Sequence, residues 1–299
     1  MNSPPVRESI RSLDDPKIEA LVRRLEGLGR VAVAYSGGVD SAFLLKAAWD
    51  VLGENAVGVL AFSESLDRNE FEAAKSLAAQ LEIPIRVIET HEYENPAYRR
   101  NDGERCYHCK TELFTEVGRF AHSLGIVHVL DGTNLDDLSD YRPGMRAKGE
   151  RGVVSPLQEA ALSKEEIRRH SRALGLPTWD KPAAPCLSSR IPYGSEVTDQ
   201  KLRQIEAAEA ALRSLGFRQL RVRHHGDVAR VEVPLVDLPR LLAEPTRDAA
   251  VCGIKAAGFL HVALDLEGFR SGSLNAALVS ASPQPPQPFL PLESVTILG

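Results

Sequence analysis

Three cysteines are the residues of this sequence best suited to metal or sulfur chemistry. Two of them, Cys106 and Cys109, form the motif CYHC, and Cys186 follows in a proline-rich stretch. The chain begins without an apolar signal segment, which indicates a cytoplasmic, reducing location where thiols serve metal binding or catalysis more often than disulfides. The pair is predicted to open a helix that runs to about Leu124, whose dipole should lower the pKa of both thiols. A fourth cysteine, Cys252, is predicted to lie in the core.

A turn rich in glycine and serine has the composition of a phosphate-binding loop. It follows the apolar run from Val31 to Tyr35, which is typical of a buried parallel strand. Adjacent glycines permit backbone angles that other residues avoid, so several N–H groups can converge on a phosphate at the start of the next helix. The turn lacks the Lys-Ser/Thr pair of a Walker A loop. The residues predicted to hold the phosphates are Ser36, Gly37, Gly38, Val39, Asp40 and Ser41.

Further polar residues follow two other predicted strands, at the carboxyl ends where such sheets bind ligands. Ser63, after the strand predicted at 56–62, is a candidate contact for the adenosine of ATP; alternatively, it caps the helix predicted at 66–81. A glycine after the strand at 127–130 would allow close approach of the backbone, and the carboxylates and amide beside it could hold magnesium or the ribose and phosphates of ATP. The candidates in this second stretch are Gly132, Thr133, Asn134 and Asp136.

Short apolar runs that alternate with amphipathic segments predict an α/β fold with a doubly wound parallel sheet. Strands are predicted at 31–35, 56–62, 85–88, 127–130 and 152–156, with a polar loop at 89–105. Asp15 and Pro16 mark the start of the first helix, and residues 163–166 form a capping box. From about residue 195, a helix, two strands, short helical stretches and a last strand predict a smaller α+β unit.

Length and charge bound the organisation of the chain. Its 299 residues, 43% of them hydrophobic, suffice for two domains. We predict one domain over 1–194, a smaller one over 195–280 and a proline-rich tail over 281–299. The net charge of −5 argues against a surface devoted to nucleic acid. No apolar run reaches the roughly 18 residues that a membrane helix needs.

Two arginines on one predicted strand are candidates for binding a substrate phosphate. Arg221 and Arg223 are two positions apart, so they project from the same face. The alternative interpretation is a solvated basic edge strand. Glu209, on the preceding helix, is a candidate for the same cleft. Arg190 is the last residue of the polar Ser-Ser-Arg sequence that follows Cys186. These polar neighbours favour a functional role for Cys186 over that of a buried cysteine with no chemical role.

Two of these motifs, SGGVDS and DGTNLDD, resemble those of the PP-loop ATP pyrophosphatases. Together with ERCYHCK, PCLSSRIPYG, LRVRHHGDVARVEV and DLEGFRSGSLN, they resemble the LarE family of ATP-dependent sulfur transferases over about residues 15 to 275. The resemblance implies a PP-loop domain of the adenine nucleotide alpha hydrolase type, a smaller C-terminal domain and a homo-oligomer. It also implies the conversion of carboxylates of pyridinium-3,5-biscarboxylic acid mononucleotide into thiocarboxylates, a step in nickel-pincer cofactor synthesis.

The chemistry expected of such an enzyme uses ATP and Mg²⁺, held in part by Asp40, to convert a carboxylate into an acyl adenylate that sulfur then attacks. The resemblance implies two versions of the sulfur source. In one, Cys186 gives up its own sulfur. In the other, Cys106, Cys109 and Cys186 hold a [4Fe-4S] cluster whose fourth iron carries an extra sulfide, and this chain has the three cysteines of that version. A structural zinc ion bound by these cysteines with His108 is a further alternative.

Three other functions compete with this interpretation. A PP-loop tRNA thiolase would use the same three cysteines but needs an RNA-binding surface, which the acidic composition disfavours. Amidotransferases share SGGVDS yet would leave the thiols without a role. A non-enzymatic redox sensor would bind ATP and a cluster without turnover, and pyrophosphate release that depends on the pyridinium mononucleotide would rule it out.

Overall fold

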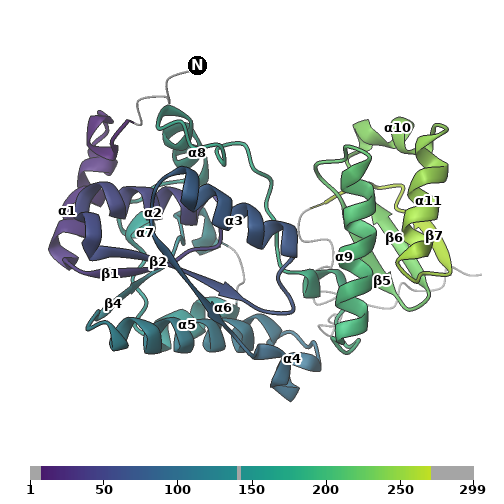
Figure 1. Cartoon of the computed structure of the whole chain (residues 1–299), viewed down its shortest axis with the longest axis horizontal. Helices are drawn as coiled ribbons and strands as arrows, with labels where there is room; N and C mark the ends of the chain where they lie inside the picture. The colour runs from purple at the N-terminus through teal and green to yellow at the C-terminus, as the bar shows by residue number, and fades with distance from the viewer. Residues whose placement is uncertain (1–7, 140–142, 271–299) are drawn as a thin grey trace, which may run out of the picture.

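The computed structural model describes residues 8–139 and 143–270, which form two lobes (Figure 1). The larger lobe contains a parallel sheet of four strands in the order β3-β2-β1-β4. This confirms the predicted α/β fold with a parallel sheet. Because β2 and β4 lie on opposite sides of β1, the strand order reverses between β1 and β4, where doubly wound sheets bind ligands. The strands are β1 (Val31–Ala34), β2 (Ala56–Phe62), β3 (Ile85–Glu89) and β4 (His128–Leu130).

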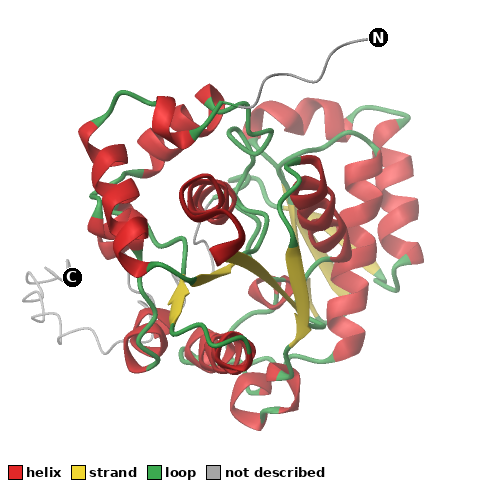
Figure 2. Ribbon diagram, turned by 60° about the vertical axis from the view of Figure 1, so that its left-hand side comes forward, coloured by secondary structure: helices red, strands yellow, loops and turns green. Residues whose placement is uncertain are grey.

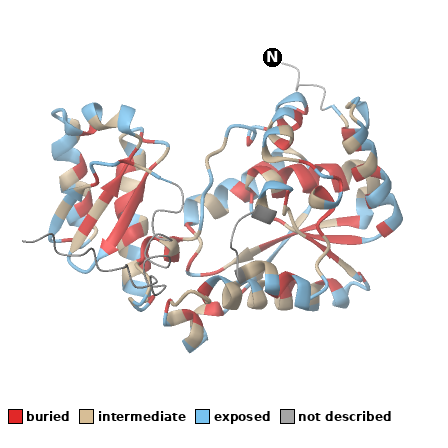
Figure 3. Ribbon diagram, turned by 180° about the vertical axis from the view of Figure 1, so that it is seen from behind, coloured by how far each residue is buried: buried red, intermediate tan, exposed pale blue. Residues whose placement is uncertain are grey.

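Helices cover both faces of this sheet (Figure 2). Val31 and Val33 of β1 pack with the apolar residues of α1 and α2, whereas Ala32 packs with Val117 of α5 on the other face. β1 and most of β2 are buried (Figure 3), whereas the residues of β3, at the edge of the sheet, are intermediate or exposed. The helices of this lobe are α1 (Pro16–Leu28), α2 (Val39–Leu52), α3 (Arg68–Gln80), α4 (Pro96–Arg99), α5 (Arg105–Ser123), α6 (Pro143–Glu150), α7 (Pro156–Glu159) and α8 (Lys164–Ala173).

The ends of several helices follow local rules. Asp15 caps α1, with Pro16 at its first position, and the capping box of Ser163 and Glu166 at the start of α8 is present as predicted. The cap of α3 is Asp67, whose side chain accepts a hydrogen bond from the backbone N–H of the second helical residue. The alternative in which Ser63 caps this helix is therefore wrong.

Two predicted segments differ from the structure. The loop predicted at 89–105 contains the 3-10 helix Glu92–Glu94 and α4, because Asn95 caps a single helical turn that is too short to show an apolar period. The strand predicted at 152–156 is reduced to a bridge between Leu130 and Val154. Gly152 has a φ of +64°, which interrupts the extended backbone of a strand just before this bridge. α7 begins at Pro156, shortly after the bridge.

The smaller lobe is an α+β unit in which helices pack against a three-stranded sheet (Figure 1). β5 and β6 are antiparallel, whereas β6 and β7 are parallel. Cys252 is exposed on α11, so its predicted place in the core is wrong. The domain boundaries at 194 and 280 stay predictions, and the tail predicted at 281–299 lies outside the described residues. The elements are α9 (Asp199–Ser214), β5 (Arg221–His225), β6 (Val228–Glu232), α10 (Leu238–Leu242), α11 (Thr246–Ala256) and β7 (His261–Leu264).

Polar contacts join the two lobes at the start of α3. Arg213 of α9 pairs with Asp67 at 2.7 Å, and the Arg68 backbone N–H donates to Glu206 at 2.8 Å. α9 therefore contacts the start of α3 directly, and its first residue, Asp199, also donates its backbone N–H to the Tyr93 hydroxyl of the larger lobe at 3.0 Å. Within the described ranges, no helix is long and apolar enough to cross a membrane.

Candidate active site

The turn between β1 and α2 is braced by its own side chains. Ser41 Oγ accepts a hydrogen bond from the Ser36 backbone N–H at 3.1 Å and lies 3.0 Å from Ser36 Oγ. Gly37 has a φ of +69°, and a Cβ there would lie 2.6 Å from the Cβ of Ala74 on α3. Gly38 is the N-cap of α2 and has no side chain to bond the first amides, so these amides remain able to bind a phosphate.

The loop after β4 lies directly against this turn. A Cβ on Gly132 would lie 2.9 Å from the Ser41 backbone nitrogen, so only glycine allows the two loops to approach this closely. Thr133 Oγ1 donates to Asp131 at 2.6 Å, and the buried Asn134 side chain accepts from the Asp136 backbone N–H at 2.9 Å. The predicted nucleotide contacts from the two motifs are therefore together, at the point where the strand order reverses.

Two lysines that the sequence analysis did not select reach this edge. Lys164, the first residue of α8, pairs with Asp40, and its backbone N–H donates to Asp136 at 2.8 Å. Lys181 donates to the Gly37 carbonyl oxygen at 3.1 Å. Lys164 and Asp40 are 124 positions apart, so no local pattern could have revealed the pair. Among the described residues, the second carboxylate oxygen of Asp40 is buried without a hydrogen-bond partner, which suits an oxygen that binds Mg²⁺.

A line of buried polar side chains connects the carboxyl end of β2 to the thiols. Ser63 Oγ lies 3.0 Å from Ser65 Oγ, which donates to Glu92 at 2.9 Å. The same carboxylate oxygen is 4.0 Å from Cys109 Sγ. The Leu187 backbone N–H donates to the Ser65 carbonyl at 2.8 Å and brings the segment that carries Cys186 to the same strand end. The sequence analysis did not identify Glu92, because it lay in a segment predicted to be an irregular loop.

Tyr98 is a buried residue in the neighbourhood of two of the three thiols. Its hydroxyl lies 2.5 Å from Ser188 Oγ. Burial raises the pKa of Tyr98 well above its usual value, and the charges of Cys186 and Cys109 raise it further. Cys186 and Cys109, although far apart in the sequence, are therefore both close enough to affect the same buried phenol.

Arg105 lies beside the third thiol. Its guanidinium donates to the Ser188 carbonyl at 2.8 Å and is 4.0 Å from Cys106 Sγ. Burial alone lowers the pKa of Arg105, but Cys186, Cys106, Tyr98 and Tyr193 together outweigh burial, so the net shift is upward. Arg105 thus places a buried cation beside Cys106.

Cys109 does not have the lowered pKa that its place in the first turn of α5 predicted. Burial raises the pKa of Cys109 well above its usual value, and the charges of Glu92 and Cys186 raise it further. The prediction for this thiol is wrong because burial and a neighbouring carboxylate exceed the effect of a helix dipole. A metal centre that bound Cys109 would stabilise its thiolate.

The three cysteines have the donor chemistry of an iron–sulfur cluster. Cys106, Cys109 and Cys186 are free thiols, and a [4Fe-4S] cluster is held by cysteine thiolates. Within the described residues, no three Cys, His, Asp or Glu side chains are grouped as ligands of one metal ion.

Buried side chains hold the backbone of the Cys186 segment. Arg190 donates to the carbonyl oxygen of Cys186 at 2.9 Å and to that of Pro185. The same guanidinium forms two hydrogen bonds with Glu209, at 2.8 and 2.9 Å, and both side chains are at most 2% exposed. The structure therefore brings these two predicted substrate-binding residues together as partners of each other.

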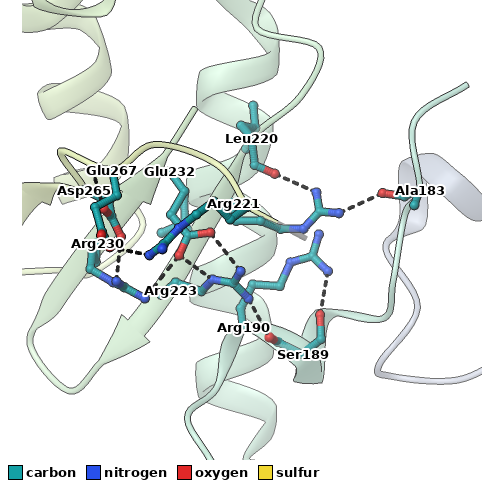
Figure 4. Close-up of polar contacts among 12 residues, drawn as sticks. Ala183, Ser189, Arg190, Leu220, Arg221, Arg223, Arg230, Glu232, Asp265 and Glu267 are labelled. Atoms are coloured by element: carbon teal, nitrogen blue, oxygen red, sulfur yellow. Dashed lines mark hydrogen bonds and ion pairs between the residues drawn. The ribbon is translucent and has the colours of Figure 1, made fainter. Parts of the chain in front are cut away.

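Arg221 and Arg223 hold the same segment from β5, as Figure 4 shows. Arg221 donates to the Ala183 carbonyl at 2.7 Å, and Arg223 donates to the Ser189 carbonyl and to Glu232, both at 2.8 Å. Both arginines are buried, which contradicts the alternative of a solvated basic strand. Burial, followed by the nearby Arg190, lowers the pKa of Arg221 to about 10.

A small polar cavity lies between the lobes beside these arginines. Asp67 and Glu70 of α3 form one side of it, and residues 181–185 pass along another. Arg221 brings to this cavity a guanidinium whose hydrogen bonds are with backbone carbonyls, whereas the other basic residues of the lining are paired with carboxylates. The basic residues that line it are Lys181, Arg190, Arg213, Arg218 and Arg221.

Comparison with known proteins identifies full-length relatives. The chain is 40% identical over 266 residues to the pyridinium-3,5-bisthiocarboxylic acid mononucleotide synthase of Lactiplantibacillus plantarum, covering 89% of this chain and 96% of that protein. It is 47% identical over 264 residues to an uncharacterized protein of Synechocystis, covering 88% and 98% of the two chains. A glutamine-hydrolyzing GMP synthase chain of Archaeoglobus fulgidus is 24% identical over 200 residues, which are 60% of this chain and 63% of that one. No family model matches the chain.

Proposed function

The chain belongs to the LarE family, that of the pyridinium-3,5-bisthiocarboxylic acid mononucleotide synthase, and from this membership we propose that it is an ATP-dependent sulfur transferase acting on the corresponding pyridinium biscarboxylic acid mononucleotide. ATP would activate each carboxylate, and sulfur would replace one carboxylate oxygen to give a thiocarboxylate for nickel-pincer cofactor synthesis. The observation that carries the proposal is the shared location of the two halves of this chemistry. The phosphate-binding turn follows β1, and the Cys186 segment bonds to Ser65 just after the adjacent β2.

The first half-reaction forms an acyl adenylate. A carboxylate oxygen of the substrate attacks the α-phosphorus of ATP, and the bond to the β-phosphate breaks with release of pyrophosphate. The first amides of α2 would stabilise the charge on the departing pyrophosphate, together with the ammonium group of Lys164. The buried free oxygen of Asp40 would hold Mg²⁺, which neutralises phosphate charge. Ser63 and the loop from Gly132 to Asp136 would contact the adenosine.

The second half-reaction replaces AMP with sulfur. A [4Fe-4S] cluster on Cys106, Cys109 and Cys186 would supply a nucleophilic sulfide from its fourth iron. Arg105 would keep positive charge beside the thiolates, and the hydroxyl of Tyr98 would hold Ser188 next to Cys186. Sulfur attacks the adenylate carbonyl, and the C–O bond to AMP breaks, so that the carboxylate becomes a thiocarboxylate.

A second candidate mechanism uses the sulfur of Cys186 itself. It is favoured by the contacts that fix the backbone around Cys186, from Arg190 and from the bond between Leu187 and Ser65. In that case the Cys186 thiolate displaces AMP to form a thioester, a base removes the Cα proton, and the Cβ–S bond breaks to give the thiocarboxylate and dehydroalanine, so each chain acts once. The two mechanisms share the adenylation step and differ only in the sulfur donor.

The phosphate of the substrate would bind in the cavity between the lobes. Arg221 reaches this cavity, and Arg223 would support it by holding Ser189. Arg190 and Glu209 would contribute by fixing the same segment rather than through free charges. We further propose that the chain works as a homo-oligomer in the cytoplasm.

The test is a reaction of anaerobically prepared protein with ATP, Mg²⁺ and the pyridinium biscarboxylic acid mononucleotide. We expect pyrophosphate release that depends on the mononucleotide, together with formation of a thiocarboxylate detected by mass spectrometry. Pyrophosphate release in response to tRNA instead, with thiolation of a base, would replace this function with that of a tRNA thiolase. ATP binding without turnover on either substrate would indicate a redox sensor.

A further inference from the structure

Lys181 connects three parts of the molecule that the proposed reaction must coordinate. Its ammonium nitrogen donates to the Gly37 carbonyl of the phosphate-binding turn at 3.1 Å and pairs with Glu70 of α3 at 2.7 Å. Its backbone lies five positions before Cys186 in the same extended segment. The side chain is only 20% exposed, so both contacts are shielded from solvent on most sides.

The two partners of this ammonium group are fixed relative to each other. Gly37 lies against α3, since a Cβ at this position would be 2.6 Å from the Cβ of Ala74. Glu70 is on the same helix, one turn before Ala74. Lys181 therefore binds two groups, Gly37 and Glu70, that are fixed relative to each other. The position of its ammonium nitrogen thus depends on the position of the phosphate-binding turn.

The segment that follows Lys181 is held mainly from elsewhere. Within the described ranges, the backbone carbonyls of Ala183 and Pro185 accept hydrogen bonds from Arg221 and Arg190. The larger lobe holds the segment near its two ends. At one end, the Lys181 side chain bonds Gly37, and Arg168 of α8 donates to the Lys181 backbone carbonyl at 2.8 Å. At the other end, Leu187 bonds Ser65. Of these two ends, only Lys181 reaches the turn where ATP is cleaved.

We propose that Lys181 is a positioning residue that ties the Cys186 segment to the phosphate-binding turn. The inference rests on the proposed function and deepens it, because it concerns how the two half-reactions are coupled. With the tie in place, the adenylate forms where sulfur can reach its carbonyl carbon. Without this contact, the adenylate still forms, but sulfur reaches its carbonyl carbon more slowly. Water then attacks the carbonyl carbon instead of sulfur. Hydrolysis then returns the carboxylate and releases AMP without a thiocarboxylate.

The test is the ratio of AMP released to thiocarboxylate formed in a single turnover, measured on the full chain. Lys181→Met retains most of the length of the side chain and removes its charge. A displacement of about 1 Å at a reacting group can lower a rate by about 100-fold, so we expect the ratio to rise at least about tenfold in this variant. Exchange of labelled pyrophosphate into ATP, measured at saturating mononucleotide, reports adenylation separately, so that a loss of substrate binding is distinguished from a change in the ratio. A lysine with a purely structural role would leave the ratio unchanged.

Three further variants sharpen the test. Glu70→Gln removes the ion pair and leaves the bond to Gly37, so the ratio should rise less than in Lys181→Met. Lys181→Arg, which restores a cation of similar length, should return the ratio toward that of the wild type. Lys75→Met, also on α3, changes a more exposed lysine paired with Glu72 and should leave the ratio unaltered.

The outcomes separate this inference from the proposed function. A folded Lys181→Met variant with the wild-type ratio would overturn the positioning role, even if adenylation and transfer both slowed equally. If the wild type releases no pyrophosphate in response to the pyridinium mononucleotide, the proposed function fails before the inference is reached. If Lys181→Met does not fold, Glu70→Gln decides, and an unchanged ratio there would overturn the proposal.

Discussion

The sheet edge formed by the β1–α2 turn and the loop after β4, which we propose binds the phosphates and call the phosphate-binding edge, is built differently from the Cys186 segment. At this edge, main-chain geometry decides the structure: Gly37 takes a positive φ, and Gly132 lets the second loop reach the first. In the Cys186 segment, long side chains decide it, since Arg190 donates to the Cys186 carbonyl and Arg221 to the Ala183 carbonyl. The first region depends on residues that lack side chains, and the second on buried charged side chains that need partners.

This difference fits the chemistry proposed for each region. Backbone amides at a helix start can bind any nucleotide phosphate, so the edge can be shared with relatives such as the GMP synthase chain. A cysteine in a segment without regular structure needs specific supports, and these come from α9 and β5 of the smaller lobe. The smaller lobe thus fixes the place from which we propose sulfur is delivered.

The largest expected effect is a complete loss of sulfur transfer while adenylation is retained. Cys186→Ala removes the proposed sulfur-delivering thiol and leaves the phosphate-binding edge unchanged. We expect no detectable thiocarboxylate, together with exchange of pyrophosphate into ATP in the presence of the mononucleotide. Cys252→Ala, on the exposed side of α11, is the control and should retain full activity. Thiocarboxylate formation by Cys186→Ala would show that this cysteine neither donates sulfur nor holds its donor.

Gly132→Ala should affect the phosphate-binding edge. The added methyl group would lie 2.9 Å from the Ser41 backbone nitrogen and force the two loops apart. We expect kcat/KM for ATP to fall by about 100-fold, as for other displacements of about 1 Å in a reacting site. Gly118→Ala is the matched control, because a Cβ added there would have no atom within 4 Å apart from the neighbouring backbone of its own helix. Alanine inside α5 should stabilise the protein by about 0.5–1 kcal/mol. An unchanged kcat/KM in Gly132→Ala would disprove the close contact.

Arg190→Met tests whether buried charges hold the Cys186 segment. Removing one partner of a buried ion pair typically costs about 3–5 kcal/mol, and Arg213 still pairs with Glu209, so we expect a loss near the lower limit. Urea unfolding measures the change. Arg218→Met removes an arginine that is 74% exposed and paired with Asp180, and should cost less than about 1 kcal/mol. Equal losses in the two variants would mean that the Arg190–Glu209 pair contributes no more than a surface pair.

The smallest effect concerns α8, which supports the phosphate-binding edge through Lys164. The hydrogen bond from Lys17 lowers the pKa of Glu166 to about 2, with help from the Ser163 backbone. Because the folded pKa lies below the unfolded value of 4.5, this stabilisation is present above pH 4.5 and is lost as the pH falls toward 2. Lys17→Met should raise the pKa of Glu166 and reduce stability at pH 7 by less than about 1 kcal/mol, since the pair is partly exposed. A stability difference from the wild type that stays constant from pH 6 to pH 2.5 would contradict this assignment.

The sequence was sufficient where local rules decide the structure. The strand before Ser36, the capping box at Ser163 and the helix that begins beside Cys106 all depend on neighbours within a few residues. The four strands of the parallel sheet were predicted within about two residues at each end, because their apolar runs end at polar turns.

The remaining features depend on distant residues. Burial, followed by the charge of Glu92 on another element, raises the pKa of Cys109. Arg221 and Arg223 could be assigned to one face of a strand, but the carbonyls of the Cys186 segment that they bond lie more than 30 positions away. Lys164 and Lys181 gave no local signal because their partners are also distant in the sequence. In each case, the deciding contact depends on the tertiary fold.

The most direct measurement is the content of iron and acid-labile sulfide per chain in anaerobically prepared protein, with Cys186→Ala beside it. The account predicts about four irons and four or more sulfides in the wild type, and their loss in the variant. Zinc or bare thiols in a protein that still forms one thiocarboxylate per chain would contradict the cluster. The sulfur would then have to come from Cys186, and the protein after reaction should be lighter by the mass of one sulfur and two hydrogens.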